Sequence, residues 1–131
     1  MNTVHPEVPE KQVGLPRRVL VVDDHAGFRR TACELLDSEG FEVVGEAEDG
    51  ASALSLAAEL APELVLLDVQ LPDENGFTVA DQLLAHHPDL KVVLVSIRDR
   101  STYGPMIEAS GASGFLSKAD LSGAALERLL A

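Results

Sequence analysis

Short apolar runs alternate along the chain with longer windows in which apolar residues recur at helical spacing. Residues 19–22 form the first run, and Phe28, Ala32, Leu35 and Leu36 then follow at positions i, i+4, i+7 and i+8. The same succession predicts further strands at residues 41–47, 64–67, 92–95 and 113–117, and further helices around residues 53–60, 79–84, 106–109 and 121–130. The pattern therefore predicts a strand followed by a helix, repeated to the end of the chain.

This strict alternation favours one parallel sheet with right-handed crossovers and helices on both of its faces. The runs at 19–22, 64–67 and 92–95 are apolar throughout, as strands covered on both faces should be, so we expect them to be central. Charge interrupts the run at 41–47, and the run at 113–117 is short and contains Gly114, which is typical of edge strands. We expect an α/β three-layer sandwich whose five-stranded parallel sheet has the order 2-1-3-4-5, a flavodoxin-like arrangement.

The length of 131 residues favours one domain, and its 46% of apolar residues suffices for a core without disulfides or metal staples. Residues 1–16 are rich in proline and polar side chains and have no period. We therefore predict a flexible leader at residues 1–16 and a folded domain at residues 17–131.

The charge balance excludes several classes of partner. Ten basic and 22 acidic residues give a net charge of -12, which repels nucleic-acid phosphates and anionic lipid surfaces. The single cysteine, Cys33, cannot form an internal disulfide and lies in a helical window, so a buried or half-buried thiol is expected. No window approaches the length of a membrane span. We expect a cytoplasmic protein that binds neither nucleic acid nor membrane directly.

Polar side chains follow the predicted strands at the point where each strand ends: Asp23 and Asp24, Asp68, Ser96 and Lys118. In the expected strand order the winding direction reverses between the first and third strands, and open α/β sheets bind ligands at the carboxyl ends beside such a reversal. Taken singly, each residue has a plainer explanation, such as a helix cap, a loop acid, a turn hydroxyl or a solvated charge. Their convergence on one edge of the sheet predicts a common site.

Three carboxylates held close together repel one another, and a hard cation relieves that repulsion. Mg²⁺ fits best, because it accepts one or two carboxylates with carbonyl oxygens and keeps several waters. The sequence therefore predicts a magnesium site formed by Asp23, Asp24 and Asp68.

Three motifs carry a resemblance to a known family: VVDD at residues 21–24, LLDVQLPDENG at 66–76 and GASGFLSK at 111–118. In this order and spacing, the chain from about residue 17 to residue 131 resembles a bacterial two-component response-regulator receiver domain. It is similar to the branch that often precedes a helix-turn-helix output domain.

The resemblance implies that Asp68 accepts a phosphoryl group from a sensor histidine kinase or a phosphotransfer protein. It also implies that Asp23, Asp24, Asp68 and the backbone carbonyl of Gln70 hold Mg²⁺, and that Lys118 supplies a second positive charge. Such a chain is a phosphoacceptor switch that catalyses only its own phosphorylation and dephosphorylation.

The resemblance places a two-state switch at Ser96 and Phe115, with Ser96 donating its hydroxyl to the phosphoryl group and Phe115 swinging inward. The alternative that Phe115 is an ordinary aromatic residue of the hydrophobic core stays open. We expect Tyr103 and Met106 to lie on the fourth helix, which in the family forms part of the output face. The output would pass through the fourth helix, the fifth strand and the fifth helix to a partner or output domain, with a homodimer as a further option. Ile97 follows the switch hydroxyl where a small residue is usual, and we expect it to crowd the phosphoryl pocket.

Two alternative functions remain open from the residues. A Mg²⁺-dependent aspartyl phosphohydrolase would use the same nucleophile, but such enzymes carry a further acid-base Asp shortly after it, and position 70 is Gln. A receiver-like docking module would work without phosphorylation, and the complete set of acids with Lys118 argues against it.

Overall fold

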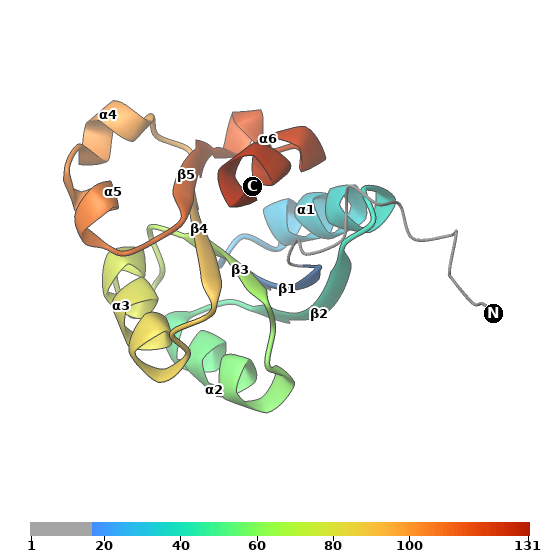
Figure 1. Cartoon of the computed structure of the whole chain (residues 1–131), viewed down its shortest axis with the longest axis horizontal. Helices are drawn as coiled ribbons and strands as arrows, with labels where there is room; N and C mark the ends of the chain where they lie inside the picture. Colours follow the sequence, from blue (N-terminus) through green and yellow to red (C-terminus); the bar gives the residue numbers. More distant parts are fainter. Residues whose placement is uncertain (1–16) are drawn as a thin grey trace.

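The computed structural model describes residues 17–131. These residues form one sheet with helices on both sides (Figure 1). The predicted flexible leader, residues 1–16, lies outside the described residues and stays a prediction. The strands are β1 (Arg18–Val22), β2 (Glu42–Ala47), β3 (Leu64–Asp68), β4 (Lys91–Ser96) and β5 (Gly114–Ser117). The helices are α1 (Ala26–Ser38), α2 (Gly50–Leu60), α3 (Gly76–His86), α4 (Arg100–Tyr103), α5 (Met106–Ala109), the short 3₁₀ helix η2 (Lys118–Asp120) and α6 (Gly123–Leu130).

The sheet has the predicted order, β2-β1-β3-β4-β5, and all neighbouring strands are parallel. Every residue of β3 is buried, as are all but the first residues of β1 and β4, whereas β2 and β5 are partly exposed. The prediction made from strand composition is therefore confirmed. Both faces of the apolar central strands are covered, and the two strands that contain charged residues or glycine form the edges.

Two apolar clusters fill the space on either side of the sheet. One contains alternate strand residues such as Val21 and Leu66, packed against Ala32 and Leu36 of α1 and Leu126 of α6. The other contains the intervening strand residues and joins them to α2, α3 and α5. Because strand side chains alternate between faces, each strand end presents its last residues to one helix layer or the other.

The region of the predicted fourth helix differs from the expectation that Tyr103 and Met106 share one helix. The structure has two single turns there, α4 and α5, because Gly104 has a φ of 53° and Pro105 follows it. A positive φ and the missing amide hydrogen of proline end the first turn at Tyr103. The predicted output face of helix 4, strand 5 and helix 5 thus corresponds to α4 and α5, β5 and α6.

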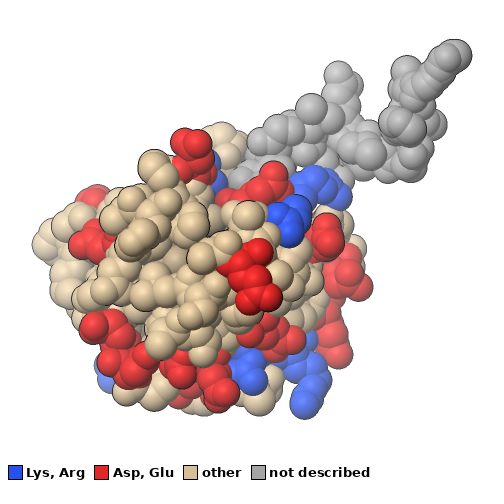
Figure 2. Space-filling view, turned by 90° about the horizontal axis from the view of Figure 1, so that it is seen from below, with Lys and Arg blue, Asp and Glu red and all other residues tan. Residues whose placement is uncertain are grey.

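Acidic side chains dominate the charge of the molecule. On the face seen in Figure 2 they surround a broad uncharged area, and basic side chains are fewer. Among residues 17–131, no helix is long and apolar enough to cross a bilayer. Cys33 is half-buried, as expected.

Candidate functional site

The carboxyl ends of β1, β3 and β5 bring three of the predicted site residues together. Asp68 is the last residue of β3, Asp23 directly follows β1, and Lys118 directly follows β5. The strand register pairs Val22 with Leu67, Asp68 with Val95 and Ser96 with Ser117, so β1, β3 and β5 end at nearly the same level. The expected convergence of Asp23, Asp68 and Lys118 is present in the structure.

The Lys118 ammonium lies between the two buried carboxylates. Its Nζ is 2.6 Å from Asp23 Oδ2 and 3.3 Å from Asp68 Oδ2, to which it donates a hydrogen bond. Asp23 Oδ2 is fully enclosed and accepts no well-aligned hydrogen bond from the described residues, so the short contact to Lys118 is an ion pair of poor hydrogen-bond geometry. One ammonium therefore balances two carboxylates, and a net negative charge remains inside the site.

Phe28 of α1 forms the floor under Lys118. The ammonium nitrogen lies 4.4 Å from the centre of the Phe28 ring, and the lysine side chain is only 11% exposed. A ring face attracts a cation and excludes water, so Phe28 fixes the amine over the acids. The sequence pattern placed Phe28 only on the core side of its helix and gave no signal for this contact.

Burial dominates the electrostatics of Asp68. The pKa of this carboxyl is raised from 3.8 to about 6. Desolvation is the largest cause and the charge of Asp23 adds to it, whereas the backbone hydrogen bond from Gln70 and the interaction with Lys118 act in the opposite direction. The Gln70 N–H donates to Asp68 Oδ1 over 3.1 Å. The site therefore disfavours a second buried negative charge unless more positive charge is added.

Asp24 and His25 complete a group of possible metal ligands. One ligand atom from each of Asp23, Asp24, His25 and Asp68 lies within 4.8 Å of all the others. His25 Nδ1 lies 3.2 Å from an oxygen of Asp23 and of Asp24, at the exposed mouth of the site. The N-cap residue of α1 is His25, whose side chain makes no capping hydrogen bond, and Asp23 Oδ1 accepts the backbone N–H of His25 at 2.8 Å.

The donor set fits a hard divalent cation. The carboxylates outnumber the cationic side chain, an enclosed oxygen of Asp23 lacks a well-aligned partner, and the pKa of Asp68 is raised to about 6. Oxygen ligands of this kind, at a rim that is partly open through Asp24, suit Mg²⁺. The predicted role of the Gln70 carbonyl as a ligand stays a prediction.

The loop after Asp68 is held from two directions. Both carboxylate oxygens of Asp73 accept backbone N–H groups at the start of α2, from Gly50 at 2.8 Å and from Ala51 at 3.1 Å. These hydrogen bonds lower the pKa of Asp73. At the far end of the loop, a side chain at Gly76 would collide with the carbonyl oxygen of Asp68 and with Val69 Cα, 2.7 Å away. The sequence could not show these long-range contacts.

The predicted switch residues lie beside the site, and a third residue joins them. Ser96 ends β4 and is buried, and Phe115 of β5 is buried as well. Tyr103 of α4 hydrogen-bonds Ser96 Oγ through its hydroxyl at 2.8 Å, and its ring centroid lies 5.7 Å from that of Phe115. Phe115 thus already points inward, and the sequence had assigned Tyr103 only to a partner-facing helix.

Ile97 differs from its expectation. Its side chain is 75% exposed, so it projects into solvent and does not crowd the site. Ile97 directly follows Ser96, the last residue of β4, and so lies outside the sheet.

Comparisons with known proteins agree with this geometry. The family model for the response regulator receiver domain matches residues 19–129. The chain is 40% identical over 114 residues to the response regulator GacA of Pseudomonas aeruginosa, covering 86% of this chain and 51% of GacA. It is 36% identical over 102 residues to the transcriptional regulatory protein DegU of Brevibacillus brevis, covering 77% of this chain and 43% of DegU. The chain thus spans about half the length of the curated relatives it matches.

Solved structures show the same fold. The signal receiver domain assigned to the response regulator NarL of Mycobacterium tuberculosis is 35% identical, with a TM-score of 0.75 over 87% of this chain and 92% of that chain. A two-component response regulator of the LuxR family from Aurantimonas sp. SI85-9A1 is 26% identical, with a TM-score of 0.77 over 86% of this chain and 81% of that chain. The match of the family model to residues 19–129 and the likeness to these relatives show that the chain belongs to the response regulator receiver domain family of two-component systems.

Proposed function

We propose that this chain is a phosphoacceptor switch in which Asp68 receives a phosphoryl group from a sensor histidine kinase or a phosphotransfer protein. The observation that carries the proposal is the position of Lys118 Nζ, 2.6 Å from Asp23 and 3.3 Å from Asp68, at the end of three parallel strands. A carboxylate oxygen of Asp68 would bond to phosphorus while the bond from phosphorus to the donor nitrogen breaks and leaves its electron pair on that nitrogen. The product is an aspartyl phosphate.

Asp23, Asp24 and Asp68, with the Gln70 carbonyl, would hold Mg²⁺. When bound, Mg²⁺ neutralises charge that develops on the phosphoryl oxygens. Other groups of the protein hold the Asp68 carboxylate in position. Lys118, held over Phe28, donates to Asp68 Oδ2, and the Gln70 N–H donates to Asp68 Oδ1, so both oxygens of the carboxylate are oriented.

The raised pKa of Asp68 has a functional consequence. Only the ionised carboxylate is a nucleophile, and a pKa of about 6 leaves a fraction of Asp68 protonated in mildly acidic solution. A cation bound beside Asp68 favours the ionised form. Metal binding and activation of the nucleophile are therefore coupled in this proposal.

The two alternatives have less support. The phosphohydrolase needs a second acid near the nucleophile, whereas position 70 is Gln and its backbone N–H already occupies Asp68 Oδ1. A docking module without phosphorylation has no need for a lysine buried against two carboxylates, which is costly to maintain. The chain is therefore proposed to turn over only its own phosphate and not to act as a classical enzyme.

The output is proposed to pass through α4, α5, β5 and α6 to a protein partner or to an output domain that controls transcription, with a homodimer as one form. DegU, by its name, is a transcriptional regulatory protein. The net charge of -12 supports an indirect effect on DNA rather than contact by these residues. We propose a cytoplasmic location, since the phosphodonor kinases act there.

Phosphorylation with acetyl phosphate and Mg²⁺, followed by intact mass spectrometry, tests the proposal. The parent protein should gain the mass of one phosphoryl group, and Asp68→Asn should gain none. Asp73→Asn is the matched control, because Asp73 lies five positions downstream and bonds only to backbone groups of α2 within the described structure. Labelling that survives Asp68→Asn would place the acceptor elsewhere, and parent protein that stays unlabelled would favour the docking module.

A further inference from the structure

Tyr103 holds the Ser96 hydroxyl on the side of the sheet away from Asp68. Ser96 follows Leu94 by two positions, and Leu94 belongs to the apolar cluster shared with α2, α3 and α5. Asp68 follows Leu66 by two positions, and Leu66 belongs to the cluster on the other face. Since strand side chains alternate, the two side chains leave their neighbouring strands toward opposite faces.

The hydrogen bonds of Ser96 agree with this placement. Within the described residues, its Oγ accepts the Arg98 N–H at 3.1 Å and bonds the Tyr103 hydroxyl at 2.8 Å, and no hydrogen bond joins it to Asp68 or Lys118. The Ser96 oxygen is thus already engaged on the α4 side. It must turn toward the rim of the sheet and leave Tyr103 in order to reach a group on Asp68.

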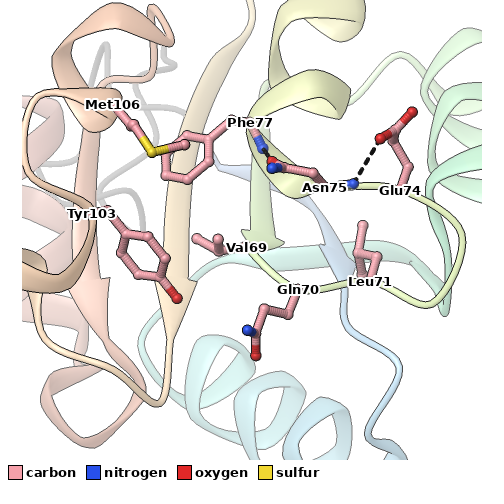
Figure 3. A pocket seen from close by; sticks show the side chains of 8 residues that line it. All are labelled: Val69, Gln70, Leu71, Glu74, Asn75, Phe77, Tyr103 and Met106. Carbon is pink, nitrogen blue, oxygen red and sulfur yellow. Dashed lines mark hydrogen bonds between the residues drawn. The ribbon is translucent and has the colours of Figure 1, made fainter.

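Tyr103 is also the main attachment of α4 to the body of the protein. No residue of the single turn Arg100–Tyr103 is buried. The ring of Tyr103 packs edge-on against Phe77, with ring centroids 5.5 Å apart, and in a tilted arrangement against Phe115, with ring centroids 5.7 Å apart. Figure 3 shows Tyr103 and Met106 on one wall of a pocket of about 530 Å³, with Val69, Gln70 and Phe77 on the side of the β3–α3 loop. The hydroxyl bond to Ser96 anchors one end of this ring.

We propose that the Tyr103 hydroxyl is a latch that competes with a phosphoryl group for Ser96, so that phosphorylation of Asp68 frees Tyr103 and loosens α4. Tyr103 is a positioning residue, because it acts through Ser96 and does not contact Asp68. The proposal rests on the phosphoacceptor function of Asp68. It also assigns a hydroxyl to the switch in a chain whose β5 switch position, Phe115, has none.

Beryllofluoride with Mg²⁺, a non-covalent stand-in for the phosphoryl group, measures the competition at equilibrium. Its affinity is read from separate bound and free signals in fluorine NMR. Tyr103→Phe keeps the ring that packs on Phe77 and Phe115 and removes only the competing hydroxyl. Because one net hydrogen bond is released, we expect Tyr103→Phe to bind beryllofluoride about two- to tenfold more tightly than the parent.

A double-mutant cycle distinguishes a latch from a purely structural tyrosine. In a Ser96→Ala background Tyr103 has no hydroxyl to hold, so Tyr103→Phe should leave the affinity unchanged. A structural role would give the same change with Ser96 present or absent. Equal or weaker binding by Tyr103→Phe, or an equal gain in the Ser96→Ala background, overturns the latch.

The chain provides its own optical reporter. Tyr103 is the single tyrosine, and there is no tryptophan, so tyrosine emission reports on one hydroxyl. Beryllofluoride should change this emission in the parent and not in Ser96→Ala. A parent protein that binds beryllofluoride without any change in emission overturns the latch alone. A parent that binds no beryllofluoride overturns the phosphoacceptor function and the latch with it.

Discussion

The buried charge of Asp68 makes the acceptor position a source of instability in the metal-free protein. Replacing it by Asn keeps the shape and an oxygen that can accept the Gln70 N–H, and removes the charge. The pKa of Asp68 rises from 3.8 to about 6, chiefly because the carboxyl is desolvated. The folded protein therefore disfavours the ionised form, and we expect Asp68→Asn to increase the free energy of unfolding at neutral pH.

The magnitude follows from the pKa difference. A shift of about two units at 1.36 kcal/mol each gives a ceiling of about 3 kcal/mol. The rim of the site is partly open to solvent through Asp24, which screens the charge, so we expect about 1–2 kcal/mol. For a domain of this size that is a rise in Tm of roughly 3–10 °C.

The direction of the pKa shift of Asp68 determines how stability depends on pH. Between the unfolded pKa of 3.8 and the folded pKa of about 6, the folded state binds more protons at Asp68 than the unfolded state does. Stability due to this group therefore falls as pH rises through that window. The advantage of Asp68→Asn should be near zero below the unfolded pKa and complete at neutral pH.

Urea denaturation of both proteins in EDTA, at about pH 4 and about pH 7, measures this difference. Asp73→Asn is a control of opposite sign, because backbone hydrogen bonds from Gly50 and Ala51 lower the pKa of Asp73. Its carboxylate contributes stability that is present above its unfolded pKa and lost as pH falls through its folded pKa. Asp73→Asn should therefore be destabilising at neutral pH. A neutral-pH loss of stability in Asp68→Asn, or a gain that does not change with pH, would refute the reasoning.

Three further outcomes are expected. Mg²⁺ should raise the Tm of the parent by preferential binding to the folded state, and Asp24→Asn should weaken this rise in a metal titration followed by calorimetry. Ile97→Ala should change stability by no more than about 0.5 kcal/mol and leave the dephosphorylation rate unchanged, since the side chain is 75% exposed; an altered rate would restore the crowding hypothesis. Gly76→Ala should destabilise by roughly 1–3 kcal/mol in urea titrations, because its Cβ would collide with backbone atoms of Asp68 and Val69, and a neutral effect would show that the loop can shift.

The sheet order could be predicted because burial leaves a direct signature in each strand. Central strands such as Leu64–Asp68 are covered on both faces and carry apolar residues at every position before the site. The site followed from the same reasoning, since parallel strands carry Asp23, Asp68 and Lys118 to one edge. Each of these conclusions depends on periods and strand ends, which are local properties of the sequence.

The contacts that could not be predicted depend on distances between elements far apart in the chain. Phe28 has the spacing of an ordinary core residue, and only the tertiary fold places its ring under Lys118, 90 positions later in the chain. Asp73 looks like a loop acid, although it bonds the start of α2, 23 positions earlier. The break after Tyr103 did have a local signal in Gly104 and Pro105, and it is this break that leaves Tyr103 at the end of a separate turn.

The two halves of the site lie on opposite faces of the sheet, and this arrangement constrains any signal that leaves Asp68. Lys118 and Phe28 belong to the layer of α1 and α6, whereas Tyr103 and Phe115 belong to the layer of α3 and α5. The side chains of both layers are buried and closely packed, so this packing opposes a rearrangement within either core. A side chain at the end of a strand is not enclosed in this way, because it can pass from one face to the other around the edge of the sheet. Ser96 occupies that position, next to the Asp68 strand and bonded to Tyr103, so the proposed signal can cross the sheet by rotation of one hydroxyl.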